Sequence, residues 1–305
     1  MGRIVDFFYA MFDLLMPRAC LTCGCKLGMR ERHLCLACAA DVPYTRYWLQ
    51  AHNPLADRFN AVLERHRGTE QMDYAYAVAL MHYKGNYRSI PRALKYHADL
   101  AAGRYFGALL GRRIASAQHL ADIDLVIPVP LHWTRRRSRG YNQSAILARA
   151  LVDGIRETVT PGLTGSLPLP VCRTDLLVRA RRTRTQTRLS IDQKARNVAS
   201  AFRVPERFPF WKRLFSRLSR LFKRWPIGAG HDEARSGLAV PRHSGLDPES
   251  PAAVLASARH ILLVDDTFTT GATLYACYAA LRPYTSARIS IATLAAVEGT
   301  PSTGP

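Results

Sequence analysis

The stretch that decides the fold is His260 to Leu274, which reads HILLVDDTFTTGATL. Its first half is short, apolar and partly β-branched, as buried strands of parallel sheets are. The strand runs directly into two carboxylates, Asp265 and Asp266, and a helical pattern begins at Gly271. In open α/β sheets, ligands bind at the carboxyl ends of the strands. The sequence therefore predicts a ligand site at the two acids.

The segment after the acids, Thr267 to Thr273, is rich in hydroxyl groups and contains Gly271. Backbone N–H groups at a helix N-terminus attract phosphate, and a glycine lets the backbone approach a phosphate closely. Two acids beside a phosphate make sense if they accept hydrogen bonds from ribose hydroxyls or share a bridging Mg²⁺. The alternative interpretation is a strand-to-helix turn with two solvated acids.

Two further segments are predicted to be buried parallel strands, Asp124 to Val129 (DLVIPV) and Arg288 to Val297 (RISIATLAAV). Helical periodicity marks three stretches, which are Ser89 to Ala115, Tyr141 to Glu157 and Gly271 to Arg282. The alternation of strands and helices predicts an α/β fold with a mostly parallel sheet, right-handed crossovers and flanking helices.

A cysteine-rich head precedes this domain. Cys20 and Cys23 form one Cys-x-x-Cys pair, and Cys35 and Cys38 form a second pair eleven residues later. Two such pairs complete the tetrahedron of thiolates that zinc prefers. We expect one structural Zn²⁺ without a catalytic role, because four sulfurs leave no coordination position open.

Three cysteines lie outside these pairs. Cys25 is a spare thiol, and its use in place of Cys23 would lengthen the two-residue spacer to four. Cys172 and Cys277 stand alone and are predicted to be core residues rather than ligands.

The chain has 305 residues, a formal net charge of +20 and a pI near 10.2. This charge favours phosphate-bearing partners or anionic surfaces, and the alternative is a basic surface that only keeps the protein soluble. The apolar stretch Ile4 to Met16 contains two acids and is predicted to be an amphipathic helix, not a membrane span. Clustered cysteine pairs without an export signal indicate metal binding in a reducing compartment, so we expect a soluble cytoplasmic protein.

Residues 206–257 interrupt the α/β pattern and are interpreted as an insertion. They contain a basic segment, Trp211 to Trp225, whose apolar residues recur at steps of three and four. Such a helix would bind a membrane surface, a partner groove or DNA, or would pack on its own domain. The tract Gly228 to Pro251 has few large apolar residues and is predicted to be mobile.

Three stretches carry a resemblance to known proteins. Val264 to Leu274 resembles the motif with which type I phosphoribosyltransferases bind 5-phosphoribosyl-1-pyrophosphate (PRPP). Asp124 to Ala148, in which PVP is followed by a basic loop and GYNQS, resembles a segment of the ComF competence family. Arg182 to Phe202 (RTRTQTRLSIDQKARNVASAF) resembles another segment of that family. The insertion has no counterpart in the family pattern, and at Thr267 and Phe268 aliphatic residues or Tyr are commoner.

The resemblance, together with the cysteine head, implies how the chain is divided. Residues 1–45 would be an N-terminal helix and a zinc-ribbon head, and 46–205 and 258–297 the two parts of a phosphoribosyltransferase-like domain. Residues 206–257 would be the insertion and 298–305 a flexible tail.

The resemblance also implies a binding site for PRPP, accompanied by Mg²⁺, in which Asp265 and Asp266 address the ribose hydroxyls. The PRPP- or phosphate-binding residues that it implies are Asp265, Asp266, Thr267, Phe268, Thr269, Thr270, Gly271, Ala272 and Thr273.

Two arginine clusters are expected near this site, the first from the predicted topology and the second from the family resemblance. The first follows the Asp124 to Val129 strand, so it shares an edge of the sheet with the acids and would neutralise a pyrophosphate or DNA phosphates. Its members are Arg135, Arg136, Arg137 and Arg139. The second falls where the family has a flexible region, which makes it a candidate lid, with a solvated loop as the alternative. Its members are Arg173, Arg179, Arg181, Arg182, Arg184 and Arg188.

Two functions follow from these features. The family resemblance implies handling of incoming single-stranded DNA in natural competence, with competence-machinery proteins as partners. His132, Trp133 and Tyr141 among the arginines agree with this function, because stacking aromatics and cations suit single strands. The alternative is an active PRPP-dependent phosphoribosyltransferase of nucleotide metabolism, for which the sequence identifies neither an acceptor nor catalytic residues. The two functions are not exclusive.

Overall fold

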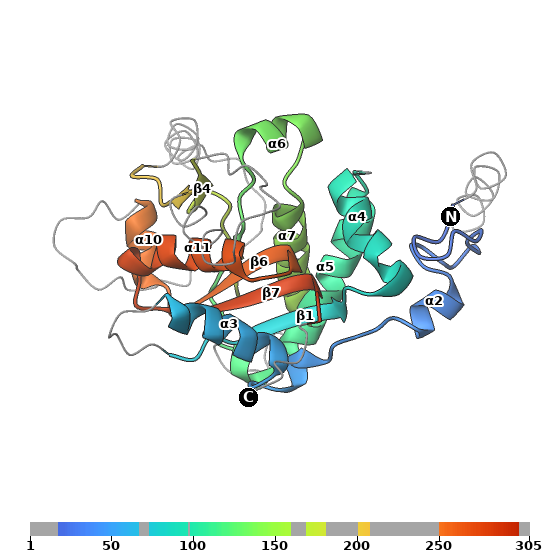
Figure 1. The fold of residues 1–305 in the computed structure, drawn as a ribbon, viewed down its shortest axis with the longest axis horizontal. Helices are drawn as coiled ribbons and strands as arrows, with labels where there is room; N and C mark the ends of the chain where they lie inside the picture. Colours follow the sequence, from blue (N-terminus) through green and yellow to red (C-terminus); the bar gives the residue numbers. More distant parts are fainter. Residues whose placement is uncertain are drawn as a thin grey trace, which may run out of the picture.

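The centre of the molecule is a five-stranded sheet in which all neighbouring strands are parallel, in the order β1-β7-β6-β2-β3 (Figure 1). This computed structural model describes residues 18–66, 73–96, 98–159, 169–180, 201–207 and 250–298. The strands of the sheet are β1 (Ala77–His82), β2 (Leu125–Pro128), β3 (Val171–Cys172), β6 (His260–Phe268) and β7 (Arg288–Ala296). The prediction of an α/β fold with a mostly parallel sheet is confirmed.

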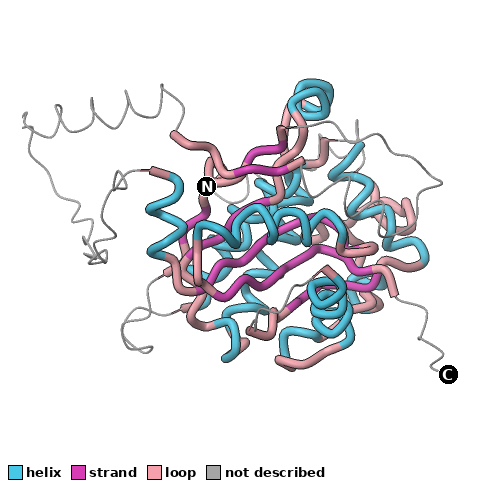
Figure 2. The backbone as a smooth tube through the Cα atoms, turned by 60° about the vertical axis from the view of Figure 1, so that its left-hand side comes forward, coloured by secondary structure: helices cyan, strands magenta, loops and turns pink. Residues whose placement is uncertain are grey.

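Helices cover both faces of the sheet (Figure 2). One layer consists of α4 (Ser89–Tyr96), α5 (Leu100–Ala115) and α7 (Gln143–Thr158). The other consists of α3 (Pro54–Arg65), α10 (Pro251–Ser257) and α11 (Ala272–Leu281). The remaining elements are α2 (Leu36–Ala40), α6 (Trp133–Arg139), the hairpin strands β4 (Val178–Arg179) and β5 (Phe202–Arg203), and the 3-10 turns η1 (Tyr47–Leu49), η2 (Gly85–Arg88), η3 (Gln118–Leu120) and η4 (Arg282–Tyr284).

The residues of β6 alternate between the two cores. Leu262 and Val264 belong to the core under α5 and α7, whereas Ile261 and Leu263 belong to the core under α3 and α11. Burial on both faces explains why the sequence of this strand is a continuous apolar run.

The predicted helix Ser89 to Ala115 is in fact two helices. The chain turns between α4 and α5, where Ala98 has a φ of 52° and the Asp99 side chain caps α5 by accepting a hydrogen bond from Ala102 N–H. Strand β1 and helix α3 were not singled out in the sequence.

Helix α10 lies inside the segment interpreted as an insertion, yet it packs on the sheet domain. The Ser250 side chain caps the helix, and Leu255 is fully buried among the residues under α3 and α11. The folded domain therefore resumes before residue 258. The following predictions lie outside the described residues: the helix Ile4 to Met16, the basic segment Trp211 to Trp225, the tract from Gly228 up to residue 249, and the tail beyond residue 298.

The close approach of α5 and α7 depends on glycines. A Cβ atom at Gly111 would lie 2.0 Å from the carbonyl oxygen of Leu151, and one at Gly154 would lie 2.2 Å from the carbonyl oxygen of Ala108. The facing backbone cannot move aside as a flexible side chain can, so any residue larger than glycine would force the helices apart. This contact sets the spacing between α5 and α7.

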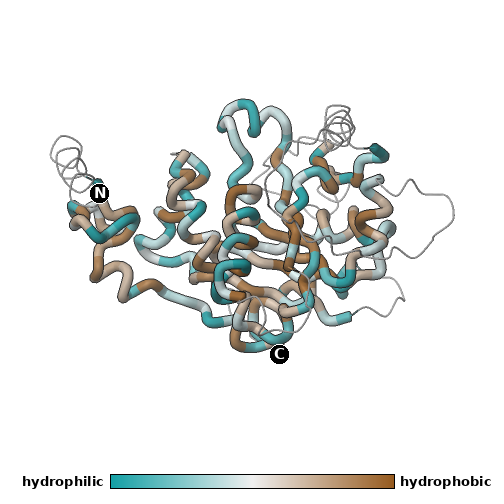
Figure 3. The backbone as a smooth tube through the Cα atoms, turned by 180° about the vertical axis from the view of Figure 1, so that it is seen from behind, coloured by the Kyte–Doolittle hydropathy of each residue, from teal (hydrophilic) through white to brown (hydrophobic). Residues whose placement is uncertain are grey.

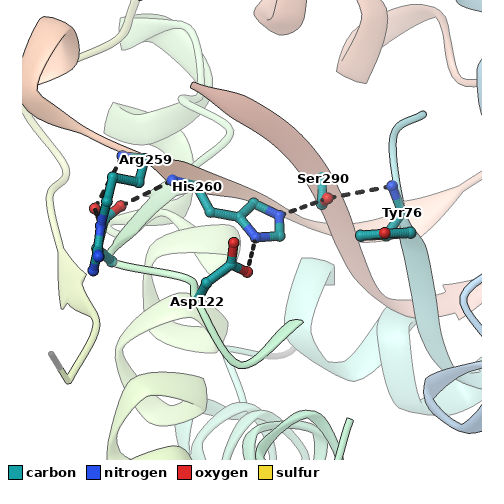
Figure 4. Close-up of polar contacts among 6 residues, drawn as sticks. Tyr76, Asp122, Arg259, His260 and Ser290 are labelled. Carbon is teal, nitrogen blue, oxygen red and sulfur yellow. Dashed lines mark hydrogen bonds and ion pairs between the residues drawn. The ribbon is translucent and has the colours of Figure 1, made fainter. Parts of the chain in front are cut away.

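A buried hydrogen-bond chain ties the amino ends of β6 and β7 together (Figure 4). His260 is fully buried, with Nδ1 2.6 Å from Asp122 Oδ1 and Nε2 2.8 Å from Ser290 Oγ. Because a carboxylate can only accept, Nδ1 carries the proton and the Ser290 hydroxyl donates to Nε2. Ser290 Oγ in turn accepts from Tyr76 N–H at 3.2 Å. Burial lowers the pKa of His260, against the raising effect of Asp122, so the imidazole is neutral at pH 7.

This chain predicts a loss of stability in mild acid. The unfolded His260 takes up a proton at a pKa of about 6.5, whereas the lowered pKa in the folded state resists protonation. The free energy of unfolding should therefore fall as pH drops below about 6.5, by up to about 1.4 kcal/mol per pH unit for this one proton. Denaturant titrations between pH 5 and 8 measure the slope, and His260→Gln should reduce it. The partly exposed His66→Gln is the matched control, and an equal slope in wild type and His260→Gln would contradict this account.

Candidate functional site

The two predicted site acids lie where β6 extends beyond its neighbour β2. Strand β2 ends at Pro128, which pairs with Val264, while β6 continues to Phe268 with only β7 beside it in the described chain. Asp265 and Asp266 therefore lie within the strand, whereas the sequence had suggested that they follow it. The side of β6 that β2 leaves open is the carboxyl edge of the sheet, where α/β proteins bind ligands.

The first turn of α7 occupies this open side and orients both acids. Ser144 Oγ donates to Asp265 Oδ1 at 2.9 Å, and Gln143 Nε2 donates to Asp266 Oδ2 at 2.9 Å. Asp265 Oδ1 also accepts from Asp266 N–H at 2.8 Å. Each carboxylate is thus held in one orientation by donors from a neighbouring element.

Lys95, at the end of α4, supplies the counter-charge. Its Nζ lies 2.9 Å from Asp266 Oδ1 and 3.3 Å from Thr267 Oγ1. Asp266 is only 4% exposed, and a buried carboxylate is stable only when it is paired and hydrogen-bonded. Lys95 and Gln143 meet that requirement. Neither residue has a role that the sequence predicts, because neither its local pattern nor its position in the chain shows what it contacts.

The two acids differ in protonation behaviour. Burial, and next the charge of Asp266, raise the pKa of Asp265 to about 7, while the hydrogen bonds from Asp266 N–H and Ser144 oppose this shift. Asp265 therefore exchanges a proton near neutral pH, so it can accept a hydrogen bond from a ligand hydroxyl or donate one.

Two buried polar atoms lie in the same neighbourhood. Gln143 Oε1 and Thr293 Oγ1 have no hydrogen-bond partner in the part of the chain that the structure describes. Thr293 is the residue of β7 that pairs with Asp265. Buried polar atoms in proteins are as a rule hydrogen-bonded, so this edge of the sheet is chemically suited to a polar ligand.

The loop after β6 is shorter than predicted. Thr267 and Phe268 still belong to the strand, and Ala272 already starts α11, which leaves Thr269, Thr270 and Gly271 between them. Phe268 is buried in the core, 1% exposed, whereas Thr269 and Thr270 are exposed. The predicted phosphate-binding loop therefore consists of three residues and the start of α11, and Phe268 belongs to the hydrophobic core.

The start of α11 has the features of an anion cradle. Gly271 has a φ of 78°, and a Cβ atom there would meet Phe268 Cζ at 3.0 Å. The N-cap residue of this helix, Gly271, has no side chain, and Thr270 Oγ1 accepts from Ala272 N–H only at 3.5 Å, whereas the side chains of the N-cap residues cap α3, α5 and α7. The partial positive charge of the helix N-terminus thus faces the Thr269 to Gly271 loop.

Arg58 of α3 anchors this loop from outside. Its guanidinium donates to the carbonyl oxygens of Val297, at 2.5 Å, and Thr269, at 2.8 Å, and lies 5.1 Å from the Phe268 ring centroid. The sequence contained no signal for this contact, which joins residues more than two hundred positions apart.

The first arginine cluster lies on a helix, not on a basic loop. Helix α6 begins after His132, whose Nδ1 accepts from Thr134 N–H, and ends at Gly140 with a φ of 77°. It follows β2, the neighbour of β6, so it stands at the same edge of the sheet as the acids, as predicted. Figures 1 and 3 show α6 as a hydrophilic projection at one end of the molecule. The cluster comprises the exposed Arg135, Arg136 and Arg137 and the partly exposed Arg139.

The second arginine cluster is described only in part. Arg173 pairs with Asp175 at 3.0 Å, and Arg179 lies over the Phe202 ring at 5.2 Å. Burial, and next the charge of Arg135, lower the pKa of Arg179, which places these two arginines near each other. Arg181, Arg182, Arg184 and Arg188 lie outside the described residues, so the lid stays a prediction.

The four cysteines of the head come together as predicted. One sulfur atom from each of Cys20, Cys23, Cys35 and Cys38 lies within 4.8 Å of all the others. Zn–S bonds of about 2.3 Å in a tetrahedron require sulfurs about 3.8 Å apart, and the Cys23 and Cys35 sulfurs are 3.7 Å apart. The donor set and its spacing fit a structural Zn²⁺.

The spare thiol lies beside the cluster, with Cys25 Sγ 3.3 Å from Cys23 Sγ. Proximity alone therefore does not exclude it as a ligand. Of the isolated cysteines, Cys277 is fully buried in α11, as predicted, and Cys172 is partly buried in β3.

The head is joined to the domain by side-chain contacts. Tyr87 O–H donates to the Cys38 carbonyl at 2.9 Å, and the His33 ring lies 5.2 Å from the Tyr105 ring. Cys20 and Leu27 are buried in the same hydrophobic core as α4 and α5. The head is thus part of the folded body beside α4 (Figure 1).

No family model matches the chain, and no curated protein matches it. Membership of the ComF family accordingly stays a prediction from the motifs. None of the described helices combines the length and the apolar character that a membrane crossing needs.

The geometry predicts one Zn²⁺ per chain. Cys35→Ser should release the metal and unfold the head, because the remaining thiolates no longer close the shell. Cys25→Ser is the matched control and should keep the metal. Elemental analysis of protein purified without chelator measures both. Less than about half an equivalent in the wild type would contradict the site, and metal loss from Cys25→Ser equal to that from Cys35→Ser would make Cys25 a ligand.

Proposed function

We propose that the protein binds a phosphoribosyl compound, PRPP in the first instance, at the carboxyl edge of β6. The observation that carries this proposal is the juxtaposition of two oriented acids, Asp265 and Asp266, with a helix N-terminus whose N-cap residue is a glycine. Carboxylates suit ribose hydroxyls and the helix N-terminus suits a phosphate. A phosphorylated ribose carries both groups.

Each part of the site has a role in this proposal. Asp265 and Asp266 accept hydrogen bonds from the ribose hydroxyls, and the Thr269 to Gly271 loop with the start of α11 holds the 5′-phosphate. The diphosphate, accompanied by Mg²⁺, faces the positive charge of the α6 arginines. Lys95 and Gln143 keep Asp266 in place and balance its charge.

Group transfer from PRPP would not need a covalent side chain. An acceptor attacks C1 of the ribose and the C1–O bond to pyrophosphate breaks, so catalysis depends on positioning and on stabilising the leaving group. The site therefore accommodates the alternative of an active phosphoribosyltransferase in nucleotide metabolism. An assay of pyrophosphate release, with PRPP, Mg²⁺ and a panel of bases, distinguishes turnover from binding alone.

PRPP binding should depend on both acids. Asp265→Asn and Asp266→Asn preserve size but remove the charge that accepts the ribose hydroxyls, so each should weaken PRPP binding about tenfold or more in calorimetry. Asp153→Asn, an exposed acid on α7, is the control and should bind like wild type. Undiminished affinity in both site variants, with thermal unfolding unchanged, would refute the assignment.

A second candidate function is binding of single-stranded DNA through α6, as the resemblance to competence proteins implies. Trp133 on this helix is 64% exposed among the arginines, and Arg139 lies 5.6 Å from the ring of Tyr96, which is 71% exposed. Exposed aromatics beside guanidinium groups suit unpaired bases and their phosphates. Partners from the competence machinery, a cytoplasmic location and a membrane contact through residues 211–225 are part of the same proposal.

DNA affinity should fall steeply with salt if α6 binds phosphates. Each phosphate contact contributes about −0.7 to the slope of log affinity against log salt for single strands. Replacing Arg135, Arg136, Arg137 and Arg139 by Gln should therefore flatten the slope by about two to three units. Trp133→Ala, which removes stacking but no charge, should weaken binding and leave the slope unchanged. An unchanged slope in the fourfold variant would place the DNA contact elsewhere.

A further inference from the structure

A groove of about 480 Å³ lies between the zinc head and the start of α4. The head contributes Thr22, from the turn between Cys20 and Cys23. The body contributes Asn86, Arg88, Ser89 and Arg92. The volume falls within the range of pockets that hold nucleotide-sized ligands.

The groove is positively charged. Arg88 and Arg92 are four residues apart on consecutive helical turns, so they project on the same side. No acidic residue lines the groove, and within the described chain neither arginine forms an ion pair. The Arg88 guanidinium lies 5.7 Å from the Tyr83 ring, which restricts its position. Two unneutralised guanidinium groups favour a ligand with more than one negative charge or several oxygens.

Neutral polar groups complete the lining. Thr22 Oγ1 is buried and has no hydrogen-bond partner among the described residues. Ser89 Oγ donates to the Asn86 carbonyl at 2.6 Å, so it serves a ligand only as an acceptor, whereas the Asn86 side-chain amide offers donors. Donors from two arginines, a threonine and an asparagine match the several oxygens of a phosphate better than the two of a carboxylate.

The groove is separate from the acid site at β6. Both touch α4, but through different residues: Arg88, Ser89 and Arg92 line the groove, whereas Lys95, in the last turn of the helix, contacts Asp266. Arg88 lies seven residues before Lys95, about 10 Å along the axis, and Arg92 lies three residues before it. A ligand in the groove would therefore contact a different set of residues.

We propose that this groove is a second binding site, for a phosphate-bearing ligand of nucleotide size. Arg88 and Arg92 bind the phosphate oxygens, and Thr22 contributes its hydroxyl from the zinc head. Because one wall belongs to the head and the other to the body, the site exists only while the head is docked. The same chemistry is offered by a free nucleotide and by the phosphates of a nucleic acid strand.

Calorimetry with the full zinc-loaded chain tests the proposal, with 5′-AMP, adenosine and a short oligothymidylate with or without a 5′-phosphate as probes. With the β6 site disabled by Asp265→Asn/Asp266→Asn in both proteins, Arg88→Gln/Arg92→Gln should bind 5′-AMP about tenfold or more weakly than the chain that keeps both arginines, and adenosine should bind weakly to both proteins. Thr22→Val should cause a smaller loss. Arg112→Gln/Arg149→Gln, which removes the same charge from a partly exposed position on α5 and an exposed position on α7, is the control and should bind like wild type.

The outcomes separate the two sources of phosphate. A loss confined to 5′-AMP and the 5′-phosphorylated strand supports a terminal phosphate, and an equal loss for both strands supports backbone phosphates. Zinc content and PRPP affinity should be unchanged in the double arginine variant that keeps Asp265 and Asp266, which shows that the head and the β6 site are intact. The proposal is overturned if, with the β6 site disabled, no phosphate probe binds the chain that keeps both arginines, or if all of them bind the double arginine variant as tightly.

Discussion

Strand β2 ends four positions before β6 in their common register, and the candidate site depends on this difference. Pro128 is the last residue of β2 and pairs with Val264, while β6 continues to Phe268 along β7. The last ladder bond that the described chain makes on this side of β2 runs from Val129 N–H to the Val264 carbonyl at 2.9 Å. The chain leaves the sheet, forms α6 and returns at Asn142, whose side chain donates to the Val129 carbonyl at 3.1 Å. The first turn of α7 therefore lies against the side of β6 that β2 leaves open.

Side-chain hydrogen bonds from α7 thus take the place of backbone hydrogen bonds from β2 on this side of β6, which is why the two acids can be accommodated. A carboxylate at 4% exposure is unfavourable unless charged or polar donors surround it, and Asp266 receives Gln143 from one helix and Lys95 from another. The positions of both donors depend on packing far from the site. Gln143 is carried by α7, which Gly111 and Gly154 allow to approach α5 to backbone contact. A substitution at either glycine would therefore displace Gln143, although neither glycine contacts the site.

Sequence alone predicts those parts of this architecture that are encoded locally. The apolar run before Asp265 and the run from Arg288 identify two neighbouring strands, and the spacing of the Cys-x-x-Cys pairs identifies the metal ligands. The roles of Lys95 and Arg58 were missed because they arise from contacts between distant segments that leave no periodic trace. The length of β6 was underestimated for a related reason: the two acids have low strand propensity, and pairing with β7 overrides it. Helix α10 was assigned to the insertion because seven residues are too few for periodicity to be recognised.

Helix α4 connects the parts of the molecule that the sequence presents as separate. Its amino end, with η2, lines the groove against the zinc head, and its last turn places Lys95 on Asp266. The head contacts the same region through Tyr87, and Cys20 is buried in the core that α4 shares with α5. A small head of this kind can hardly bury enough apolar surface to fold alone, so a metal held by the four cysteines would stabilise it together with the docking surface. Helix α4 is held at one end by the head and at the other by the ion pair between Lys95 and Asp266. A displacement of the head would therefore be transmitted to the acids by this helix of only two turns.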